Sequence, residues 1–357
     1  MMTVSLCVVA YNEEKFLGRL LDNITKQTYP HELTEIVLIN SMSTDNTIKI
    51  MNDFQNSDHD FKNVVIADNI SRIQAAGWNE AIMSANEEVI VRIDAHAYMP
   101  PNFIENRMKN IELGEFVAGG PCSSIYENDD SWGNLLLKTD NSMFGSGINV
   151  CRRGIKKNYV NTMSHTAYRR EVFAKVGGFN ENLARTEDNE VHYRIRQAGY
   201  KLCFDPEAVS YQYARSSLKR MINQKFGNGY WIGLTLGVCP GCISVFHLVP
   251  CAFVLGIILT AFLSCFGIWQ LASLMWGLYA LFAVGNTVIT AINDGFHLFT
   301  PVMPIIFLLL HVSYGLGTLK GIFEMPFKRK QLKACDRIEE VKEYVKKSLE
   351  IGCEENV

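Results

Sequence analysis

Four short apolar runs in the first hundred residues alternate with segments of helical periodicity. Each run is rich in β-branched residues, which favour buried strands: 4–10, 34–40, 63–69 and 89–93. Between the runs, apolar side chains recur every three or four residues, as in 16–24 and 72–86. Strands that alternate with helices at this spacing predict an α/β fold around a mostly parallel sheet. Such sheets bind ligands at the carboxyl ends of their strands.

The pattern after residue 101 is less regular. A helical pattern begins at residue 167 and stops at the pair Gly177 and Gly178. A further helix is predicted from Thr186 until Gly199 ends it, and a strand follows. These elements continue the same polar, mixed-charge part of the chain.

The second half of the chain changes character, because residues 226–293 contain no Asp, Glu, Lys or Arg. Three apolar segments, 244–266, 268–292 and 299–319, each contain about 20 or more residues, enough to cross a bilayer core of roughly 30 Å. The alternative is a soluble helical core. Soluble helices carry a polar stripe, however, so the pattern favours a membrane module.

The charges that flank the apolar part raise a conflict over orientation. Basic residues precede the first segment and follow the last: Lys219, Arg220, Lys225, Lys320, Lys328, Arg329 and Lys330. Basic flanks prefer the cytoplasmic side, so both ends require an even number of spans, but three candidates are present. Either one segment is re-entrant or interfacial, or the charge-free run 226–243 holds a fourth membrane element. We expect a polar domain over 1–231, a membrane module over 232–325 and a charged, solvated tail over 326–357.

Charge and cysteine usage narrow the class of protein. The formal net charge of −3 does not favour a nucleic acid polymer as partner. The first strand starts at Val4 without a signal peptide before it, so we expect a cytosolic polar domain with reduced thiols. The motif "CPGC" at 239–242 is interpreted as two small residues near a membrane surface, since no partner ligands are spaced for a metal.

Polar residues follow the first two predicted strands. In "VVAYNEE" (8–14) a strand runs into a helix start, whose free N–H groups suit a nucleotide, although an ordinary helix cap has the same composition. In "INSMSTDNT" (39–47) Asn40 ends a strand, where a side chain that reads a base would lie. Asp45 in the same turn is suited to cap the next helix.

Asp94 and His96 end the fourth predicted strand, in "RIDAHAYMPP". Side chains at positions i and i+2 of a strand point the same way, so the carboxylate and the imidazole converge. Together they can hold Mg²⁺ or Mn²⁺ when substrate phosphates supply the remaining ligands, and the imidazole favours Mn²⁺. The pair is a weak signal alone and a strong one at this edge of a nucleotide-binding sheet.

Two later segments carry further candidates. Glu187, Asp188 and Glu190 crowd one helix start, where the helix dipole alone stabilises them, but one carboxylate there can also remove a proton from an attacking hydroxyl. In the basic and aromatic segment 211–231, one interpretation is a helix that lies on anionic lipid. The other is that three of its residues close over a diphosphate: Arg215, Gln224 and Trp231.

Together these segments resemble the family 2 inverting glycosyltransferases of the GT-A fold. The family's motifs occur in order along 3–231 as "AYNEE", "SMSTDNT", "RIQAAGWNEAI", "DAH", "AYRREVFAKVGGFNENLARTEDNE" and a Q-x-F-x-x-G-x-W stretch at its end. More narrowly, "SMFGSG", "HTAYRREVF" and "YARSSLKRMINQKFGNGYW" are similar to the membrane-attached enzymes of the succinoglycan-biosynthesis type.

The resemblance implies a role for each candidate residue. Those that would hold the nucleotide or line its cleft are Ala10, Tyr11, Asn12, Glu13, Asn40, Arg72, Gly77, Asn79 and Asp94. Asp94 and His96 would bind Mg²⁺ or Mn²⁺. Asp188, beside Glu187, would be the general base. The acceptor or the diphosphate would meet His165, Arg215, Gln224 and Trp231.

Two departures from the family pattern concern the donor and the metal. The family usually has Asp where Asn40 stands; an amide carbonyl also accepts from a uracil N–H, so uracil stays open. His96 replaces a carboxylate, and because an imidazole protonates in acid, metal affinity is expected to fall at acidic pH. The same triplet with His occurs in the narrower group of relatives.

The implied function is metal-dependent, inverting transfer of a sugar from a nucleotide sugar, a UDP-sugar favoured, to a lipid-linked saccharide. The expected setting is exopolysaccharide or capsule assembly at a bacterial inner membrane, with a multi-pass chain and a cytoplasmic catalytic domain. One alternative is a polyprenyl-phosphate sugar synthase, whose lipid phosphate acceptor needs no base. Another is a membrane scaffold with an inactive transferase domain, which His96 and Asn40 favour and which intact Asp94, Glu187 and Asp188 oppose.

Overall fold

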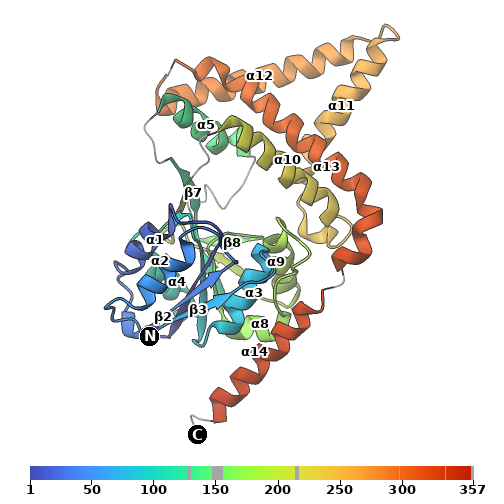
Figure 1. The fold of residues 1–357 in the computed structure, drawn as a ribbon. Coiled ribbons are helices and arrows are strands. Elements are labelled where there is room, and N and C mark those ends of the chain that lie inside the picture. The colour runs from blue at the N-terminus through green and yellow to red at the C-terminus, as the bar shows by residue number, and fades with distance from the viewer. Residues whose placement is uncertain (127–129, 147–155, 214–216, 297, 334, 355–357) are drawn as a thin grey trace. The chain divides into compact units, whose positions relative to one another are not determined.

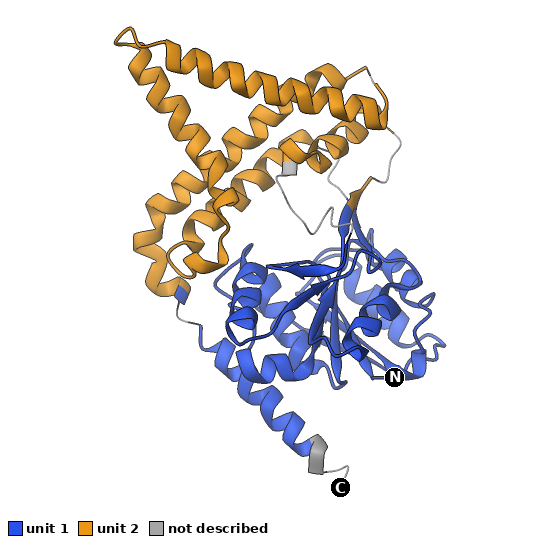
Figure 2. Ribbon diagram, turned by 180° about the vertical axis from the view of Figure 1, so that it is seen from behind, with its two compact units in different colours: residues 1–123, 150–213, 333–357 blue, residues 124–149, 214–332 orange. Residues whose placement is uncertain are grey.

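The computed structural model describes residues 1–126, 130–146, 156–213, 217–296, 298–333 and 335–354. They form two compact units (Figure 2). The first unit comprises residues 1–123, 150–213 and 333–357, and the second comprises 124–149 and 214–332. The domain limits at 231 and 325 remain predictions.

A mixed sheet forms the centre of the first unit (Figure 1). Within the described residues its strand order is β3-β2-β1-β4-β9-β6-β10-β8. The strands are β1 (Val4–Ala10), β2 (Thr34–Asn40), β3 (Asn63–Asp68), β4 (Val89–Asp94), β6 (Val117–Gly119), β8 (Asn158–Val160), β9 (Ala167–Arg169) and β10 (Leu202–Phe204). The first four are mutually parallel, as their apolar runs predicted. A small second sheet has the order β5 (Ala97–Tyr98), β11 (Ser210–Tyr213) and β7 (Cys122–Ile125).

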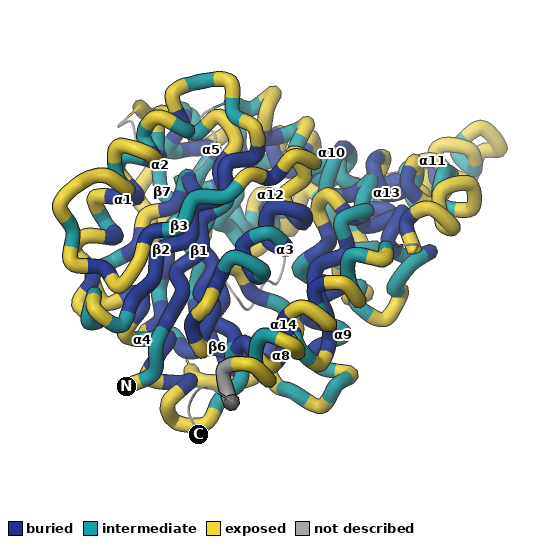
Figure 3. Tube along the Cα trace, turned by 60° about the horizontal axis from the view of Figure 1, so that its bottom comes forward, coloured by how far each residue is buried: buried dark blue, intermediate teal, exposed yellow. Residues whose placement is uncertain are grey.

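Helices cover both faces of the main sheet, and alternate strand residues point to opposite cores. Leu6 and Val8 join the core under α1 (Leu17–Ile24), α2 (Thr47–Gln55) and α4 (Phe103–Glu112). Cys7 joins the core under α3 (Gln74–Ser84), α8 (Arg170–Val176), α9 (Glu187–Gln197) and α14 (Arg337–Glu354). A 3-10 turn, η1 (His31–Leu33), precedes β2. Burial along β1 and β2 is nearly continuous because both faces are covered, whereas the edge strand β3 is more exposed (Figure 3).

The helix predicted from residue 167 starts three residues later than its pattern indicated. Ala167–Arg169 form β9, which pairs antiparallel with β4 on one side and with β6 on the other. Tyr168 and Ala167 are fully buried there, and ladder hydrogen bonds on both sides outweigh the helical periodicity of so short a segment. The helix begins at Arg170 and ends before Gly177, which adopts a φ of 80°.

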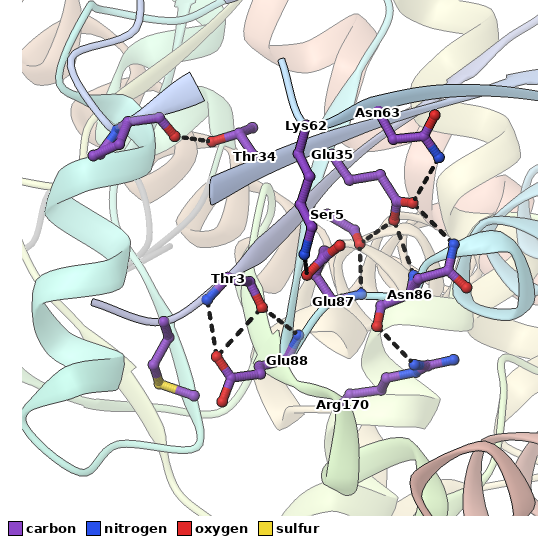
Figure 4. A network of polar contacts seen from close by, with 12 residues as sticks. Thr3, Ser5, Thr34, Glu35, Lys62, Asn63, Asn86, Glu87, Glu88 and Arg170 are labelled. Carbon is purple, nitrogen blue, oxygen red and sulfur yellow. Dashed lines mark hydrogen bonds and ion pairs between the residues drawn. The ribbon is translucent and has the colours of Figure 1, made fainter. Parts of the chain in front are cut away.

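A polar network ties together the amino ends of the strands, at the opposite edge from the candidate site (Figure 4). The buried carboxylate of Glu35 accepts hydrogen bonds from Ser5 Oγ at 2.6 Å and from the backbone N–H of Asn86 at 2.9 Å. Glu87 pairs with Lys62 at 2.8 Å. Arg170 Nη1 donates to the carbonyl of Asn86 at 3.1 Å. These contacts satisfy buried polar groups and give this edge a structural role.

The second unit is helical. Its helices are α5 (Ser131–Asn141), α6 (Met143–Ser146), α10 (Leu218–Thr235), α11 (Val249–Ser264), α12 (Gln270–Asp294) and α13 (Met303–Lys333), with 3-10 turns η2 (Pro240–Cys242), η3 (Val245–Leu248) and η4 (Thr300–Val302). Among the described residues, three helical stretches are long and apolar enough to cross a membrane: Val245–Ser264, Gln270–Asp294 and the stretch that contains α13. Leu135 and Leu136 of α5 pack with Ala283 of α12 and Phe307 of α13.

Helices α10 and α13 pack through glycines at a spacing of four residues. A Cβ atom built on Gly229 or Gly233 of α10 would meet the backbone of α13. Conversely, one built on Gly317 or Gly321 would meet the backbone of α10. Small residues at this spacing let two helix backbones approach closely, as in membrane helix pairs. Most of the basic and aromatic segment 211–231 is therefore part of a packed helix.

One face of α14 is buried in the first unit, whereas the sequence predicted a solvated tail helix. Val341 and Val345 are fully buried in the core that also contains α3 and α8. Arg337, at the start of α14, forms ion pairs with Glu80 and Glu181. The charged composition of the helix concealed two apolar positions four residues apart, which occupy one face.

Candidate active site

The carboxyl ends of the parallel strands bring the sequence-predicted nucleotide residues to one edge of the sheet. Ala10 of β1 is in register with Asn40 of β2, and Asn40 with Asp68 of β3. Val9 is in register with Asp94 at the end of β4. This is the edge at which parallel α/β sheets bind ligands.

The loops that follow β1 and β2 are bound to each other. Asn12 donates its backbone N–H to Ser43 Oγ at 3.1 Å, and its side-chain carbonyl accepts from the N–H of Thr44 at 2.8 Å. The N–H of Glu13 donates to Thr47 Oγ1 at 2.8 Å. Tyr11 is half exposed. The predicted "AYNEE" turn is therefore a fixed loop with one aromatic side chain at its surface.

Asn40 is buried and uses both ends of its amide. Its Nδ2 donates to Asp68 Oδ1 at 2.9 Å, and its Oδ1 accepts from the N–H of Ser43 at 3.0 Å. Asp68 is exposed, so a carboxylate lies at the strand end beside the amide. Sequence reasoning missed Asp68; its signal was a carboxylate directly after an apolar strand.

Four residues other than glycine adopt a positive φ among the described residues: Asn12, Met42, Arg72 and His165. The first two follow β1 and β2, the third lies between β3 and α3, and the fourth precedes β9. All four thus lie in loops next to the same sheet edge. Left-handed backbone is costly for such residues and clusters at functional sites.

Asp94 is the centre of a cluster of imidazole and amide groups. Its Oδ2 lies 3.3 Å from His165 Nε2 and 3.5 Å from Gln212 Nε2, while its Oδ1 accepts from Gln74 Nε2 at 3.3 Å. His96 Nε2 accepts from Gln212 Nε2 at 2.6 Å. Sequence reasoning predicted three members of this group and missed Gln74 and Gln212. Gln74 lies at the start of α3 within the quoted segment "RIQAAGWNEAI", and Gln212 lies in the short strand β11.

Electrostatics favour a charged Asp94 beside a protonated His165. Burial alone would raise the pKa of Asp94, but the hydrogen bond and charge of His165, with the charges of His96 and Arg92, hold it well below its usual range. Burial opposes the protonation of His165, yet nearby Cys122 and the carboxylate of Asp94 raise its pKa to about 10. The pKa of His96 is also raised, because Glu13 and Asp94 outweigh its burial.

The donor set of this cluster fits a divalent cation that takes further ligands from substrate. One carboxylate and one imidazole, those of Asp94 and His96, can coordinate Mn²⁺, whereas Mg²⁺ prefers oxygen. Within the described residues, no three His, Cys, Asp or Glu side chains are arranged as a complete metal site. Metal binding by Asp94 and His96 therefore stays a prediction.

Asp188 and Glu187 start α9, and strand β4 contacts one of them. Arg92 Nη1 donates to Asp188 Oδ1 at 2.7 Å, and the Asp188 side chain is 31% exposed. Glu187 is buried, and burial together with the charge of Asp188 raises its pKa to about 8. At neutral pH the buried Glu187 is thus a neutral carboxylic acid, and it lies beside the partly exposed Asp188. Arg92 was missed, although a charged residue inside an apolar strand was its signal.

Several predicted site residues lie away from this cluster. Asn79 is fully buried and binds the backbone of Phe179 through both ends of its amide, at 2.6 and 3.0 Å. A Cβ on Gly77 would collide with Val9, so Gly77 permits close packing of α3 on β1. The Arg72 side chain is exposed. The nucleotide roles of these three residues stay predictions.

The remaining predicted residues belong to the segment 214–231. Gln224 and Trp231 lie on α10 in the second unit and are partly buried. Lys225, next to Gln224, pairs with Asp140 of α5 at 2.8 Å. Arg215 lies outside the described residues. The predicted roles of all three toward acceptor or diphosphate remain untested.

Comparison with known proteins identifies a family and relatives of this chain. Residues 5–177 match the model of the glycosyl transferase family 2. A dolichyl N-acetyl-α-D-glucosaminyl phosphate 3-β-D-2,3-diacetamido-2,3-dideoxy-β-D-glucuronosyltransferase of Methanococcus voltae is 27% identical, with 90% of this chain and 97% of the relative covered. The succinoglycan biosynthesis protein ExoA of Rhizobium meliloti (strain 1021) is 25% identical, with 90% and 96% covered.

The fold has a counterpart among solved structures. The mannosyltransferase PcManGT from Pyrobaculum calidifontis, in complex with GDP-Man and Mn²⁺, superposes with a TM-score of 0.57 at 17% identity and covers 89% of this chain and 87% of its own. The chain therefore carries a glycosyl transferase family 2 domain on a GT-A-like fold, and it is a glycosyltransferase.

Proposed function

We propose that this glycosyltransferase moves a sugar from a nucleotide sugar to a lipid-linked saccharide during bacterial exopolysaccharide or capsule assembly. The observation that carries the proposal is the layout of β4. This strand ends at Asp94, and His96 follows in the turn between β4 and β5. Two residues before Asp94, Arg92 contacts Asp188. The two relatives that match nearly the whole chain are named for transfer to a dolichyl-linked sugar and for succinoglycan biosynthesis, which supports a lipid-linked acceptor in polysaccharide assembly.

Asp188 acts as the general base in this proposal. The acceptor hydroxyl gives its proton to the Asp188 carboxylate while its oxygen bonds to the anomeric carbon of the donor sugar. The bond from that carbon to the diphosphate breaks, and its electron pair leaves with the nucleoside diphosphate. Attack from the face opposite the leaving group inverts the configuration.

Asp94 and His96 are proposed to hold Mg²⁺ or Mn²⁺, with the imidazole favouring Mn²⁺. When bound, the cation neutralises the charge on the leaving diphosphate. His165 orients the Asp94 carboxylate, because its Nε2 lies 3.3 Å from Asp94 Oδ2. The other ring nitrogen of His165, Nδ1, is hydrogen-bonded to Ser210 Oγ at 2.9 Å. The proposed role of His165 near the diphosphate is compatible with this position.

A UDP-sugar is the favoured donor. Asn40 and Asp68 bring an amide and a carboxylate to neighbouring strand ends, 2.9 Å apart. A carboxylate or an amide carbonyl can accept the imide N–H of uracil. The exposed carboxylate of Asp68 thereby offsets the absence of the family's usual Asp at position 40.

We further propose that α11 and α12 cross the bilayer as a hairpin, with the catalytic unit in the cytoplasm at the inner membrane. The apolar windows of these two helices are only 11% and 17% buried in protein, whereas that of the α13 stretch is 44% buried. Two spans return the chain to its starting side, which satisfies the basic flanks on both sides of the apolar part. In this arrangement α13 lies among α5, α10 and α12 without crossing the bilayer.

A donor screen tests the function. Membranes that contain the protein receive labelled UDP-, GDP- or dTDP-sugars and a lipid extract, with Mn²⁺ or with EDTA. Label that enters the lipid fraction from one donor, and only with the metal, is the expected result. Equal labelling by Asp188→Asn would favour a polyprenyl-phosphate sugar synthase, and nucleotide binding without turnover would favour an inactive scaffold.

Reporter accessibility tests the membrane arrangement. Single cysteines at Gly267, between α11 and α12, and at Leu298, before α13, are labelled in spheroplasts with a membrane-impermeant maleimide, in a chain without its native cysteines. The hairpin predicts labelling at 267 and none at 298. Labelling of Leu298→Cys from outside would contradict it.

A further inference from the structure

Arg92 is a buried cation enclosed by two aromatic rings. Its guanidinium carbon lies 4.1 Å from the ring centre of Trp78 and 4.6 Å from that of Phe179. Its side chain is 7% exposed, and its Nη1 reaches Asp188 Oδ1 at 2.7 Å. The rings restrict the guanidinium plane, so the direction in which the side chain presents its N–H groups is fixed.

Stability alone does not explain this arrangement. Burial of a guanidinium is costly, and a buried ion pair is often no more stable than apolar side chains of similar volume. Nε of Arg92 has no hydrogen-bond partner within the described residues, which adds to the cost. Apart from Asp94 at its end, the other residues of β4 are apolar. The strand carries this positive charge only where Arg92 contacts Asp188 in the first turn of α9.

A second contact fixes the same helix one turn later. Tyr168 OH lies 3.5 Å from Arg92 Nη1 and 2.7 Å from His192 Nε2. Burial lowers the pKa of His192 to about 4, so this imidazole is neutral and accepts a hydrogen bond from the tyrosine hydroxyl. His192 Nδ1 in turn lies 3.0 Å from Thr162 Oγ1. Asp188 and His192 are four residues apart on α9, and both are tied to the sheet.

We propose that Arg92 is the positioning residue for Asp188. This proposal rests on the proposed function, in which Asp188 is the general base. The stacked guanidinium holds Oδ1, and Oδ2 accepts no hydrogen bond within the described part of the chain. Oδ2 is therefore the oxygen presented to the acceptor hydroxyl. Arg92 touches neither donor nor acceptor in this account; it fixes the carboxylate in the orientation that takes the proton.

Substitutions of Arg92 test the proposal in the full-length protein, with the donor that the screen identifies and with Mn²⁺. Arg92→Met keeps the volume and removes the charge and the hydrogen bonds. Displacement of a catalytic group by about 1 Å costs about 100-fold, so kcat should fall by about that factor while the donor KM stays within about twofold. Arg92→Lys, which keeps the charge but not the fork, should recover about tenfold of that loss.

Arg170→Met is the matched control. Arg170 is also a buried arginine of the first unit, but it bonds the carbonyl of Asn86 at the opposite edge of the sheet. Its substitution should lower the melting temperature and leave kcat unchanged. If Arg92→Met does not fold, Arg92→Lys alone decides, because a normal kcat in that variant overturns the proposal.

The variant Asp188→Asn distinguishes failure of the general-base role of Asp188 from failure of the positioning role of Arg92. If it is inactive while Arg92→Met turns over normally, the positioning role is wrong and the base assignment stands. If Asp188→Asn itself turns over normally, the proposed function and the positioning role both fail. A double variant no slower than Asp188→Asn is expected, whereas multiplied losses would show that the two residues act independently.

Discussion

His165 Nε2 lies 3.3 Å from Asp94 Oδ2, although 71 residues separate the two in sequence. The contact exists because β9 runs antiparallel beside β4, so that the loop before β9 meets the carboxyl end of β4. His165 lies in that loop and has a left-handed backbone conformation, so the contact links the end of β4 to this loop. An imidazole that sequence reasoning assigned to the acceptor or diphosphate is thus also a neighbour of the proposed metal ligand.

The first prediction concerns the pH dependence of metal binding. The pKa of His96 is raised above 6.5, since Glu13 and Asp94 outweigh burial. Below that pKa the metal-free imidazole holds a proton that metal must displace, so Mn²⁺ affinity should fall as the pH decreases from about 8 to about 6. The Mn²⁺ affinity is measured at each pH by titration with Mn²⁺, followed by electron paramagnetic resonance.

His96→Asp supplies the control for that titration, because a carboxylate at position 96 removes the imidazole proton from the competition. The variant should bind Mn²⁺ with a weaker dependence on pH across the same range. An affinity of the unsubstituted protein that does not change between these pH values would contradict the assignment of His96.

The second prediction concerns stability. Burial, then the charge of Asp188, raises the pKa of Glu187 from 4.5 to about 8. The folded state therefore binds this proton more tightly than the unfolded state. The resulting stabilisation is complete below pH 4.5 and is lost as the pH rises through about 8.

Glu187→Gln removes that titration. Its melting temperature should fall less than that of the unsubstituted protein between about pH 6 and pH 9, where each 1 kcal/mol corresponds to roughly 2–4 °C. Glu171→Gln, at an exposed carboxylate of α8, is the control. Parallel curves for the unsubstituted protein and Glu187→Gln would show that Glu187 does not titrate in this way.

The third prediction concerns the packing of α10 on α13. A Cβ atom at Gly317 would overlap the carbonyl of Phe226, so Gly317→Ala should destabilise the second unit by about 1–3 kcal/mol. Gly285→Ala on α12, where a Cβ meets nothing within 4 Å, should be neutral or slightly stabilising. Melting temperatures in one detergent compare the two, and equal values would refute the close packing.

Much of the site could be predicted because its signals are local. Asp94 ends an apolar strand with His96 in the turn after it, and "AYNEE" follows another strand, so strand direction alone brings them to one edge. The parallel pairing of β1 to β4 followed from the same alternation of strands and helices. The periodicity of apolar residues and the positions where strands end are local properties of the sequence. They determine which residues lie at the same edge of the sheet.

The rest depends on contacts between distant segments. The periodicity of 167–176 is helical, yet Ala167–Arg169 are a strand because β4 and β6 pair with them on both sides. The resemblance placed Asn79 along the nucleotide cleft. In the structure its side-chain amide donates to the backbone carbonyl of Phe179, a hundred residues away. The charges of α14 indicated a solvated helix, while Val341 and Val345 complete a core. No local pattern encodes such partners.

The measurement that tests the central claim most directly compares Asp188→Asn with the unsubstituted protein. Donor binding is measured by equilibrium titration, and transfer of labelled sugar to the lipid fraction is measured with Mn²⁺ present. We predict that the variant binds the donor with unchanged affinity and transfers no sugar above background, since the site is intact but the base is gone. Transfer at the unsubstituted rate would contradict the account.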